Sequence, residues 1–359
     1  MPDISQTIEE IQEEIRKTPY HKGTEHHIGK LRARLAKLKD KELEGTTKSK
    51  GGGGGGGYAV KKQGDATVVL IGPPSAGKST LLNKLTNAES KVAPYAFTTV
   101  SVIPGMLLYR GAYIQILDVP GLIEGARLGK GRGKEVLSVA RAADLLLIMS
   151  DVDRQEYIEK LVFELEDAGI RINKSKPNVR IEKKTGGGLT IHSNITQDVS
   201  KETISAVAQE FGIKNAEITL KEKLSIERLI DAFSSSRVYI PALFLVNKID
   251  QKGKKSLPAH SLPISAQEGE GLEKLKEEIW NQLALVTIYL VRPDDEPSMN
   301  NPMIMKKGNT LKDVAEKIGT DFGENKRLAK IWGGSAHYPG QEVPLTKEVE
   351  EGLMVRFIS

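Results

Sequence analysis

Hydrophobic residues in the first part of the chain recur at the spacing of an α-helix. Isoleucine recurs every three or four residues within 4–17, and isoleucine and leucine do so within 25–44. Pro19 and Gly23 separate the two segments, so the pattern predicts two amphipathic helices joined by a turn. The second segment is rich in cations, which favours either a solvated helix face or a contact with nucleic acid or the ribosome. Its cations are Lys30, Arg32, Arg34, Lys37, Lys39 and Lys41.

Farther along the chain, continuous apolar stretches replace this pattern. Strands are predicted at 67–71, 113–117, 143–149 and 240–246, with a helix at 79–86 after the first of them. Strands that are apolar throughout are typical of a parallel sheet covered by helices on both faces. The fold class of this part is therefore α/β.

Two other segments interrupt the α/β rhythm. Residues 171–237 combine alternating strand patterns with helical ones and predict a small inserted α+β domain. Residues 288–359 begin and end with strands around a helix at 310–318, which predicts a compact mixed domain. Seven consecutive glycines at 51–57 lose much entropy on ordering, so we expect a flexible linker there, the alternative being a functional loop.

Composition narrows the classes of function. The length of 359 residues suggests two or three domains, 39% of the residues are hydrophobic, and the formal net charge is +5. Cysteine is absent, which excludes disulfides, thiolate metal sites and cysteine nucleophiles. The polar amino terminus lacks a signal-peptide pattern, and the apolar runs are far shorter than the roughly 18 residues that a transmembrane helix needs. We expect a cytoplasmic, monomeric protein that does not enter membranes.

The segment after the strand at 67–71 matches the G-x-x-x-x-G-K-[ST] pattern, and a helical segment follows it. In this context glycines let the backbone wrap phosphates, and the helix amino terminus favours their negative charge. Lys78 is expected to reach the β- and γ-phosphates during catalysis, and Ser79 to bind Mg²⁺. The predicted phosphate-binding residues are Gly72, Pro73, Pro74, Ser75, Ala76, Gly77, Lys78, Ser79 and Thr80.

Two further segments complete the predicted phosphate and magnesium site. Asp118 closes an apolar strand and is expected to hold Mg²⁺, and the Gly121 amide is expected to contact the γ-phosphate. A threonine between the loop and Asp118 can close over the γ-phosphate and complete the Mg²⁺ site. Thr99 is the preferred candidate and Thr98 the alternative. Thr99 and Gly121 are therefore, with Lys78, the predicted catalytic residues.

The segment after the last predicted strand of the sheet indicates which base is bound. The carboxylate of Asp250 can accept hydrogen bonds from guanine N1–H and N2–H₂, two donors that adenine lacks. Asn247 can bond to the N7 side of the base, and the stem of Lys248 can cover the ring. Ser265 and Ala266 fit a short segment whose backbone amide contacts guanine O6. GTP and GDP are thus the predicted ligands.

Together these residues resemble the Obg-type GTPases, and more narrowly the developmentally regulated GTP-binding protein family of archaea and eukaryotes. The resemblance lies in Tyr95–Thr99, in Asp118–Ala126 and in the glycine-rich run, and it extends to Ile331–Ala336 in the tail. It implies a P-loop G domain with a helical hairpin arm, a ribosomal-protein-like α+β insertion and a carboxyl-terminal TGS domain, which is a ubiquitin-like β-grasp. The implied boundaries are 1–50 for the arm, 51–64 for the linker, 65–170 and 238–287 for the G domain, 171–237 for the insertion and 288–359 for the TGS domain.

Leu122 restrains the predicted mechanism. Many small GTPases place a glutamine after the glycine that corresponds to Gly121 to orient the attacking water, and a leucine cannot do this. Related GTPases with such a replacement often use K⁺, held by an asparagine where this chain has Ser75, so K⁺ is a weaker candidate cofactor than Mg²⁺. Arg127 and Arg132 are further candidates for catalysis, the alternative being that both are solvated.

Three functions remain open from the sequence. The first is a slow Mg²⁺-dependent GTPase switch acting on ribosomes or RNA, and the second is a nucleotide-gated binding scaffold whose hydrolysis is incidental. The third is an ATPase, since an Obg-related branch with a TGS domain prefers ATP, although Asp250 argues against it. The resemblance also implies a dedicated regulatory protein as partner. His21, His26 and His27 are expected to be solvated rather than to bind metal.

Overall fold

A computed structural model describes residues 4–45, 63–86, 93–94, 101–119, 132–251, 257–324 and 326–358. The chain forms two compact units, a smaller one of Met1–Tyr58 with Val162–Ile240 and a larger one of Ala59–Leu161 with Pro241–Ser359. The predictions for Thr98, Thr99, Gly121, Leu122 and Arg127 fall outside the described residues, as does the glycine run.

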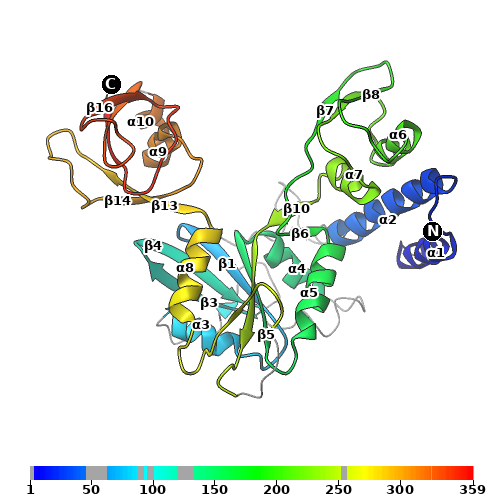
Figure 1. The fold of residues 1–359 in the computed structure, drawn as a ribbon, viewed down its shortest axis with the longest axis horizontal. Helices are drawn as coiled ribbons and strands as arrows, with labels where there is room; N and C mark the ends of the chain where they lie inside the picture. The colour runs from blue at the N-terminus through cyan, green and yellow to red at the C-terminus, as the bar shows by residue number, and fades with distance from the viewer. Residues whose placement is uncertain are drawn as a thin grey trace. The chain divides into compact units, whose positions relative to one another are not determined.

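The larger unit contains a seven-stranded sheet (Figure 1). Its first five strands in spatial order are parallel, and the last two are antiparallel to their neighbours. In spatial order the strands are β12 Ser261–Pro263, β11 Ala242–Asn247, β5 Leu145–Asp151, β1 Ala66–Ile71, β4 Ala112–Asp118, β3 Ser101–Tyr109 and β2 Ala93–Pro94.

The central strands are apolar because both faces of the sheet are covered. Every residue of β1 and of β5 is buried, as expected for a parallel sheet between helix layers. Leucines of α3 (Lys78–Thr86) and α8 (Leu272–Gln282) join alternate residues of β1 in one core cluster. α4 (Arg132–Arg141) buries its own apolar residues, among them Val136 and Val139. Arg132 is thus the first residue of a helix.

Two strand boundaries differ from the predictions. The strand expected at 143–149 is β5, which starts and ends two residues later. The strand expected at 240–246 is interrupted by Pro241, whose ring nitrogen has no hydrogen to donate to a ladder. The residues before it form β10 (Val238–Ile240), which pairs with β6 (Ile170–Ile172) in the smaller unit. A third difference is β3, for which the sequence predicted no strand. Its proline and glycine interrupt the apolar residues of this segment.

The carboxyl-terminal part of the larger unit is a five-stranded sheet with its own core. β13 and β17 are parallel, and the other neighbouring strands are antiparallel. Thr310 caps α9, because its side chain accepts from the Asp313 amide while the Asp313 carboxylate accepts from the Thr310 amide. The elements are β13 Leu285–Leu290, β14 Pro302–Lys306, α9 Leu311–Ile318, α10 Thr320–Glu324, β15 Leu328–Trp332, β16 Gln341–Pro344 and β17 Met354–Ile358.

The smaller unit joins the amino-terminal helices to the inserted segment. The helices α1 and α2 pack together as the predicted hairpin, and α2 also packs on α6 and α7. α5 (Glu156–Asp167) leads from β5 into this unit. The elements are α1 Ile4–Lys17, α2 Glu25–Gly45, β6 Ile170–Ile172, β7 Val179–Lys183, β8 Leu189–Ser193, α6 Lys201–Glu210, β9 Ala216–Leu220, α7 Ile226–Phe233 and β10.

The second helix of the hairpin is part of the core of the insertion. Ala33 is fully buried within the cluster formed by α6, α7 and β9. Three of its cations are also engaged inside the unit. Arg32 pairs with Glu227, Lys37 donates to the Glu210 carbonyl oxygen, and Lys39 pairs with Asp167. The exposed cations of this helix are Lys30, Arg34 and Lys41.

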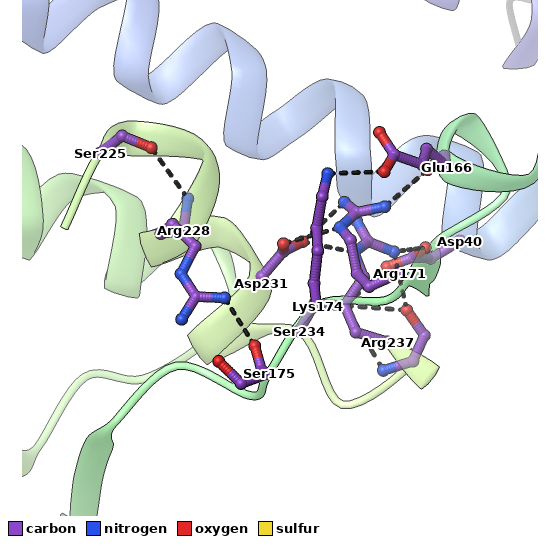
Figure 2. A network of polar contacts seen from close by, with 11 residues as sticks. Asp40, Glu166, Arg171, Lys174, Ser175, Ser225, Arg228, Asp231, Ser234 and Arg237 are labelled. Atoms are coloured by element: carbon purple, nitrogen blue, oxygen red, sulfur yellow. Dashed lines mark hydrogen bonds and ion pairs between the residues drawn. The ribbon is translucent and has the colours of Figure 1, made fainter. Parts of the chain in front are cut away.

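A buried polar network fixes the end of α2 to the base of the insertion (Figure 2). Asp231 of α7 accepts two hydrogen bonds from Arg171, at 2.6 and 2.7 Å, and one from Arg237 at 3.1 Å. Arg237 also donates to Asp40 of α2 at 2.8 Å. Since the charges are paired and hydrogen-bonded, their burial is compensated. The network therefore joins α2, α7, β6 and Arg237, the residue before β10, at one point.

Glu25 fixes the other end of α2. Its side chain is only 4% exposed, and its carboxylate accepts hydrogen bonds from Lys22, from the Ser200 amide and from the Thr203 hydroxyl. Burial alone would raise the pKa of Glu25, but these donors lower it from 4.5 to about 2. The carboxylate also lies at the amino terminus of α6, where a helix favours negative charge.

Glu25→Gln should therefore change how the smaller unit responds to acid. Because the pKa is lowered on folding, the ionised carboxylate stabilises the unit above pH 4.5 and loses this effect as the pH falls toward about 2. The shift corresponds to about 3 kcal/mol, which the variant should lack at neutral pH. Hydrogen exchange of α2 and α6 amides at pH 7 and pH 3 would measure it. The exposed Glu9→Gln serves as control, and identical pH dependence in Glu25→Gln and the wild type would contradict the prediction.

Candidate functional site

The predicted site residues that the structure describes gather at one edge of the seven-stranded sheet. The loop of residues 72–77 follows β1, Asp118 is the last residue of β4, and Asn247 is the last residue of β11. These strands are parallel within the sheet, so their carboxyl ends lie at the same edge. Ligands of open α/β sheets bind at this edge.

Lys78 binds carbonyl oxygens of the loop of residues 72–77, and some amides of this loop have no acceptor among the described residues. Lys78 Nζ donates to the carbonyl oxygens of Gly72 at 2.9 Å and Pro73 at 3.0 Å. Among the described residues, neither the Ser75 nor the Gly77 amide has a hydrogen-bond acceptor. Free amides beside a buried lysine at the start of a helix form an anion-binding concavity.

Two opposite charges are buried beneath this loop. Lys78 is 8% exposed and Asp118 is 2% exposed. Burial lowers the pKa of Lys78, and the nearby Asp118 carboxylate opposes this effect. Burial likewise raises the pKa of Asp118, against the hydrogen bond from Ser79 and the charge of Lys78. A nearby anion would stabilise the charged form of Lys78, and a nearby cation would stabilise the charged form of Asp118.

The oxygen atoms near Asp118 fit a hard divalent cation. Ser79 Oγ donates to Asp118 Oδ2 at 2.7 Å, and the second carboxylate oxygen, Oδ1, is buried without a hydrogen-bond partner among the described residues. A hydroxyl and a carboxylate are ligands that Mg²⁺ takes, usually together with substrate phosphates and water. The described residues contain no cluster of three or more His, Cys, Asp or Glu side chains, and Thr99, the predicted third magnesium residue, lies outside them.

Asn247 connects the loop to the segment at 265–266. Its Nδ2 donates to the Ala76 carbonyl oxygen at 2.8 Å, and its Oδ1 accepts from the Ala266 amide at 2.9 Å. Ser265 is fully buried, and its hydroxyl accepts from the Glu268 amide. Asn247 therefore joins the loop of residues 72–77 to Ala266, and the roles of Asn247, Ser265 and Ala266 in base binding stay predictions.

Gly77 and Gly72 are required by close approach of the backbone. A Cβ at Gly77 would lie 2.3 Å from Asn247 Nδ2, and Gly77 also has a φ of +95°, which disfavours other residues. A Cβ at Gly72 would lie 2.3 Å from the Met149 carbonyl oxygen. The two glycines of the motif thus let the loop lie directly against β5 and β11.

Lys248 and Asp250 follow Asn247 at the surface. Lys248 is half-buried with a φ of +64°, and its Nζ lies 3.5 Å from Asp151 Oδ2. Asp250 is exposed, which leaves its carboxylate accessible to a ligand. Pro74, Ser75, Ser79 and Thr80 are exposed as well.

Sequence reasoning missed Asp151 and Arg154. Asp151 is the last residue of β5 and is 4% exposed, and Arg154 binds both this carboxylate and the Pro74 carbonyl oxygen. The sequence did contain a signal for Asp151, because this residue ends an apolar strand in the same way as Asp118 does. It was overlooked because the strand was predicted to end at residue 149.

The sequence matches known proteins over its whole length. Residues 67–184 match the family described as a 50S ribosome-binding GTPase, residues 186–285 its carboxyl-terminal region, and residues 286–359 the TGS domain. A GTP-binding protein of Methanocaldococcus jannaschii is 45% identical over 99% of this chain and 93% of its own. Developmentally-regulated GTP-binding protein 2 of Homo sapiens is 39% identical over 99% of both chains.

No helix in the described part of the chain is long and apolar enough to cross a membrane.

Gly77→Ala tests the close approach of loop and β11. The added Cβ would collide with Asn247 Nδ2 and would strain the backbone, so we expect GDP affinity to fall about tenfold or more. Titration with a fluorescent GDP analogue would measure it. Gly111→Ala is a matched control, because Gly111 has a φ of +84° but open space around its Cβ. Equal affinities of Gly77→Ala and the control would contradict the prediction.

Proposed function

Because the chain belongs to the family of developmentally regulated GTP-binding proteins, which are P-loop GTPases, we propose that the loop after β1 binds the phosphates of GTP and GDP. The Ser75 and Gly77 amides carry the proposal, because they lie beside the buried Lys78 and have no acceptor among the described residues. The phosphates would supply the negative charge that a buried ammonium needs. Asn247, which touches both the loop and Ala266, would align phosphate and base sites.

Guanine selectivity is assigned to the segment after β11. Asp250 would accept the two hydrogen bonds of the guanine edge, and the stem of Lys248 would cover the ring. The exposure of Asp250 and the burial of Asn247 beside it support this assignment. ATP is disfavoured, since adenine would leave a carboxylate facing no donor.

Ser79 and Asp118 would hold Mg²⁺, with Thr99 as the predicted third residue. When bound, this ion neutralises charge that develops on the phosphates. Lys78 would move from the Gly72 and Pro73 carbonyl oxygens to the β- and γ-phosphates, and the Gly121 amide would contact the γ-phosphate. In-line attack of water on the γ-phosphate would then give GDP and phosphate.

Slow hydrolysis is part of the proposal. Leu122 cannot orient the attacking water, so a monovalent cation such as K⁺ or a protein partner would have to complete the site. The protein would then act as a conformational switch between its GTP and GDP states. A dedicated regulatory protein fits this need.

We further propose that the switch acts in the cytoplasm on ribosomes or RNA during translation. Two observations support it. The matching family is described as ribosome-binding, and α2 keeps Lys30, Arg34 and Lys41 exposed along one side while its other cations are engaged internally. Exposed cations without internal partners can neutralise phosphates of RNA.

Phosphate release tests the enzymatic part of the proposal. Purified protein would be mixed with GTP and Mg²⁺ in Na⁺ or K⁺ buffer, with and without ribosomes. We expect slow release that a cation or ribosomes accelerate. Absence of phosphate release under all four conditions would sink the claim.

Asp250→Asn should shift base preference. The amide replaces one acceptor oxygen by a donor, which mismatches guanine but suits the O2 of xanthine. Competition of GDP and xanthosine diphosphate for a fluorescent nucleotide would measure the shift. Unchanged GDP affinity in the variant would refute the assignment of Asp250.

A gated binding scaffold, in which hydrolysis is incidental, is the alternative that Leu122 favours. Cosedimentation with ribosomes in the presence of GDP or a non-hydrolysable GTP analogue, for the wild type and Lys78→Ala, distinguishes gated from ungated binding. We expect stronger binding of the wild type with the GTP analogue and loss of this difference in Lys78→Ala. Equal binding in every combination would argue against any gated function.

A further inference from the structure

Arg154 connects the phosphate loop to the buried end of β5. Its Nη2 donates to the Pro74 carbonyl oxygen at 3.0 Å and to Asp151 Oδ2 at 2.6 Å, and its Nε lies 3.1 Å from the same carboxylate oxygen. The Asp151 side chain is 5% exposed, and the Arg154 side chain is 32% exposed. A guanidinium held in this bidentate way has little freedom to turn.

This contact sets the orientation of one peptide group in the loop. A trans peptide is planar, so its N–H points opposite to its C=O. Because the Pro74 carbonyl points to Arg154, the Ser75 amide must point away from Arg154. The two preceding carbonyls, of Gly72 and Pro73, turn instead toward Lys78. The peptide between Pro74 and Ser75 is therefore where the carbonyl direction changes.

Ser75 needs such support because its backbone is strained. Its φ is +62°, in the left-handed region that residues with a Cβ avoid. Its amide has no acceptor among the described residues, and its side chain is exposed. Nothing in its own side chain holds the conformation, whereas the carbonyl before it is fixed by Arg154.

Asp151 carries a second contact, to the guanine side of the site. Its Oδ2 lies 3.5 Å from Lys248 Nζ, and Lys248 has the same unusual backbone as Ser75, with a φ of +64°. The hydrogen bonds from Arg154 and the charges of Arg154 and Lys248 keep the pKa of Asp151 low despite its burial. One carboxylate thus holds Arg154, which reaches the Pro74 carbonyl oxygen of the loop, and also lies beside Lys248.

We propose that Arg154, held by Asp151, is a positioning residue of the nucleotide site that fixes the Ser75 amide for the β-phosphate, while Asp151 also positions Lys248 over the base. The inference rests on the proposed binding of GTP and GDP. It assigns a role to two residues that the nucleotide-binding motifs do not contain. Arg154 acts through the loop backbone and does not itself need to touch the nucleotide.

The two residues should affect different parts of the ligand. Arg154 controls a peptide in the first half of the loop, whereas the Ser79 and Thr80 amides belong to the first turn of α3 and do not depend on it. Losing Arg154 should therefore weaken GDP more than GMP, which lacks the β-phosphate. Losing the charge of Asp151 should weaken both, because Lys248 is also released.

The test measures dissociation of a fluorescent GDP from the full-length protein, and competition by GDP and by GMP. For Arg154→Ala we expect GDP to dissociate about tenfold faster, the effect of one charge-assisted hydrogen bond, with GMP affinity within about twofold of wild type. For Asp151→Asn we expect both affinities to fall by about tenfold. Arg292→Ala, an exposed arginine of the same unit, should leave both unchanged.

The outcomes separate this inference from the function on which it rests. A wild-type chain that binds no fluorescent GDP overturns the proposed function and the inference together. Wild-type binding with unchanged GDP dissociation in Arg154→Ala overturns the inference alone. An equal loss for GDP and GMP in Arg154→Ala also overturns it, since that pattern marks general damage to the site. Thermal unfolding of each variant without nucleotide shows whether it is folded.

Discussion

The burial of the Lys78 ammonium group is the constraint around which the larger unit is arranged. A charge removed from water is costly unless it is paired and hydrogen-bonded. The carbonyl oxygens of Gly72 and Pro73 supply hydrogen bonds, and Asp118 supplies the opposite charge nearby. This requires a tight loop against β5 and β11, which only glycine permits at two positions. Within the described part of the chain the same loop leaves the Ser75 and Gly77 amides without acceptors, so a phosphate is the group that would satisfy lysine and backbone together.

The smaller unit follows a different principle, in which buried pairs join segments far apart in the sequence. Glu25 ties the start of α2 to α6, and Asp40 and Arg237 tie its end to the base of the insertion. Between them Ala33 packs in the insertion's core. The amino-terminal hairpin and the insertion, assigned to separate domains from the sequence, are thus grouped in one compact unit.

Much of the fold was predictable because the sequence patterns that indicate it are formed by residues close together in the chain. The apolar runs of β1 and β4, the glycine motif and the helical spacing of α1 and α2 each depend on neighbours in the sequence. β3 was missed because its proline and glycine break the apolar pattern, although the strand pairs with β4 from Ile103 to Tyr109. The contact of the Asp151–Arg154 pair with the loop was missed because Arg154 and Pro74 lie 80 residues apart in the sequence. The regions around Thr99 and Gly121 stay predictions, since they lie outside the described residues.

The central claim is that the free amides of the loop after β1 receive the phosphates of a guanine nucleotide. Hydrogen exchange of residues 72–80, measured with Mg²⁺ and either GDP, ADP or no nucleotide, tests it most directly. We expect strong protection of this loop with GDP and little change with ADP. Absence of protection in this loop at GDP concentrations that saturate binding would contradict it.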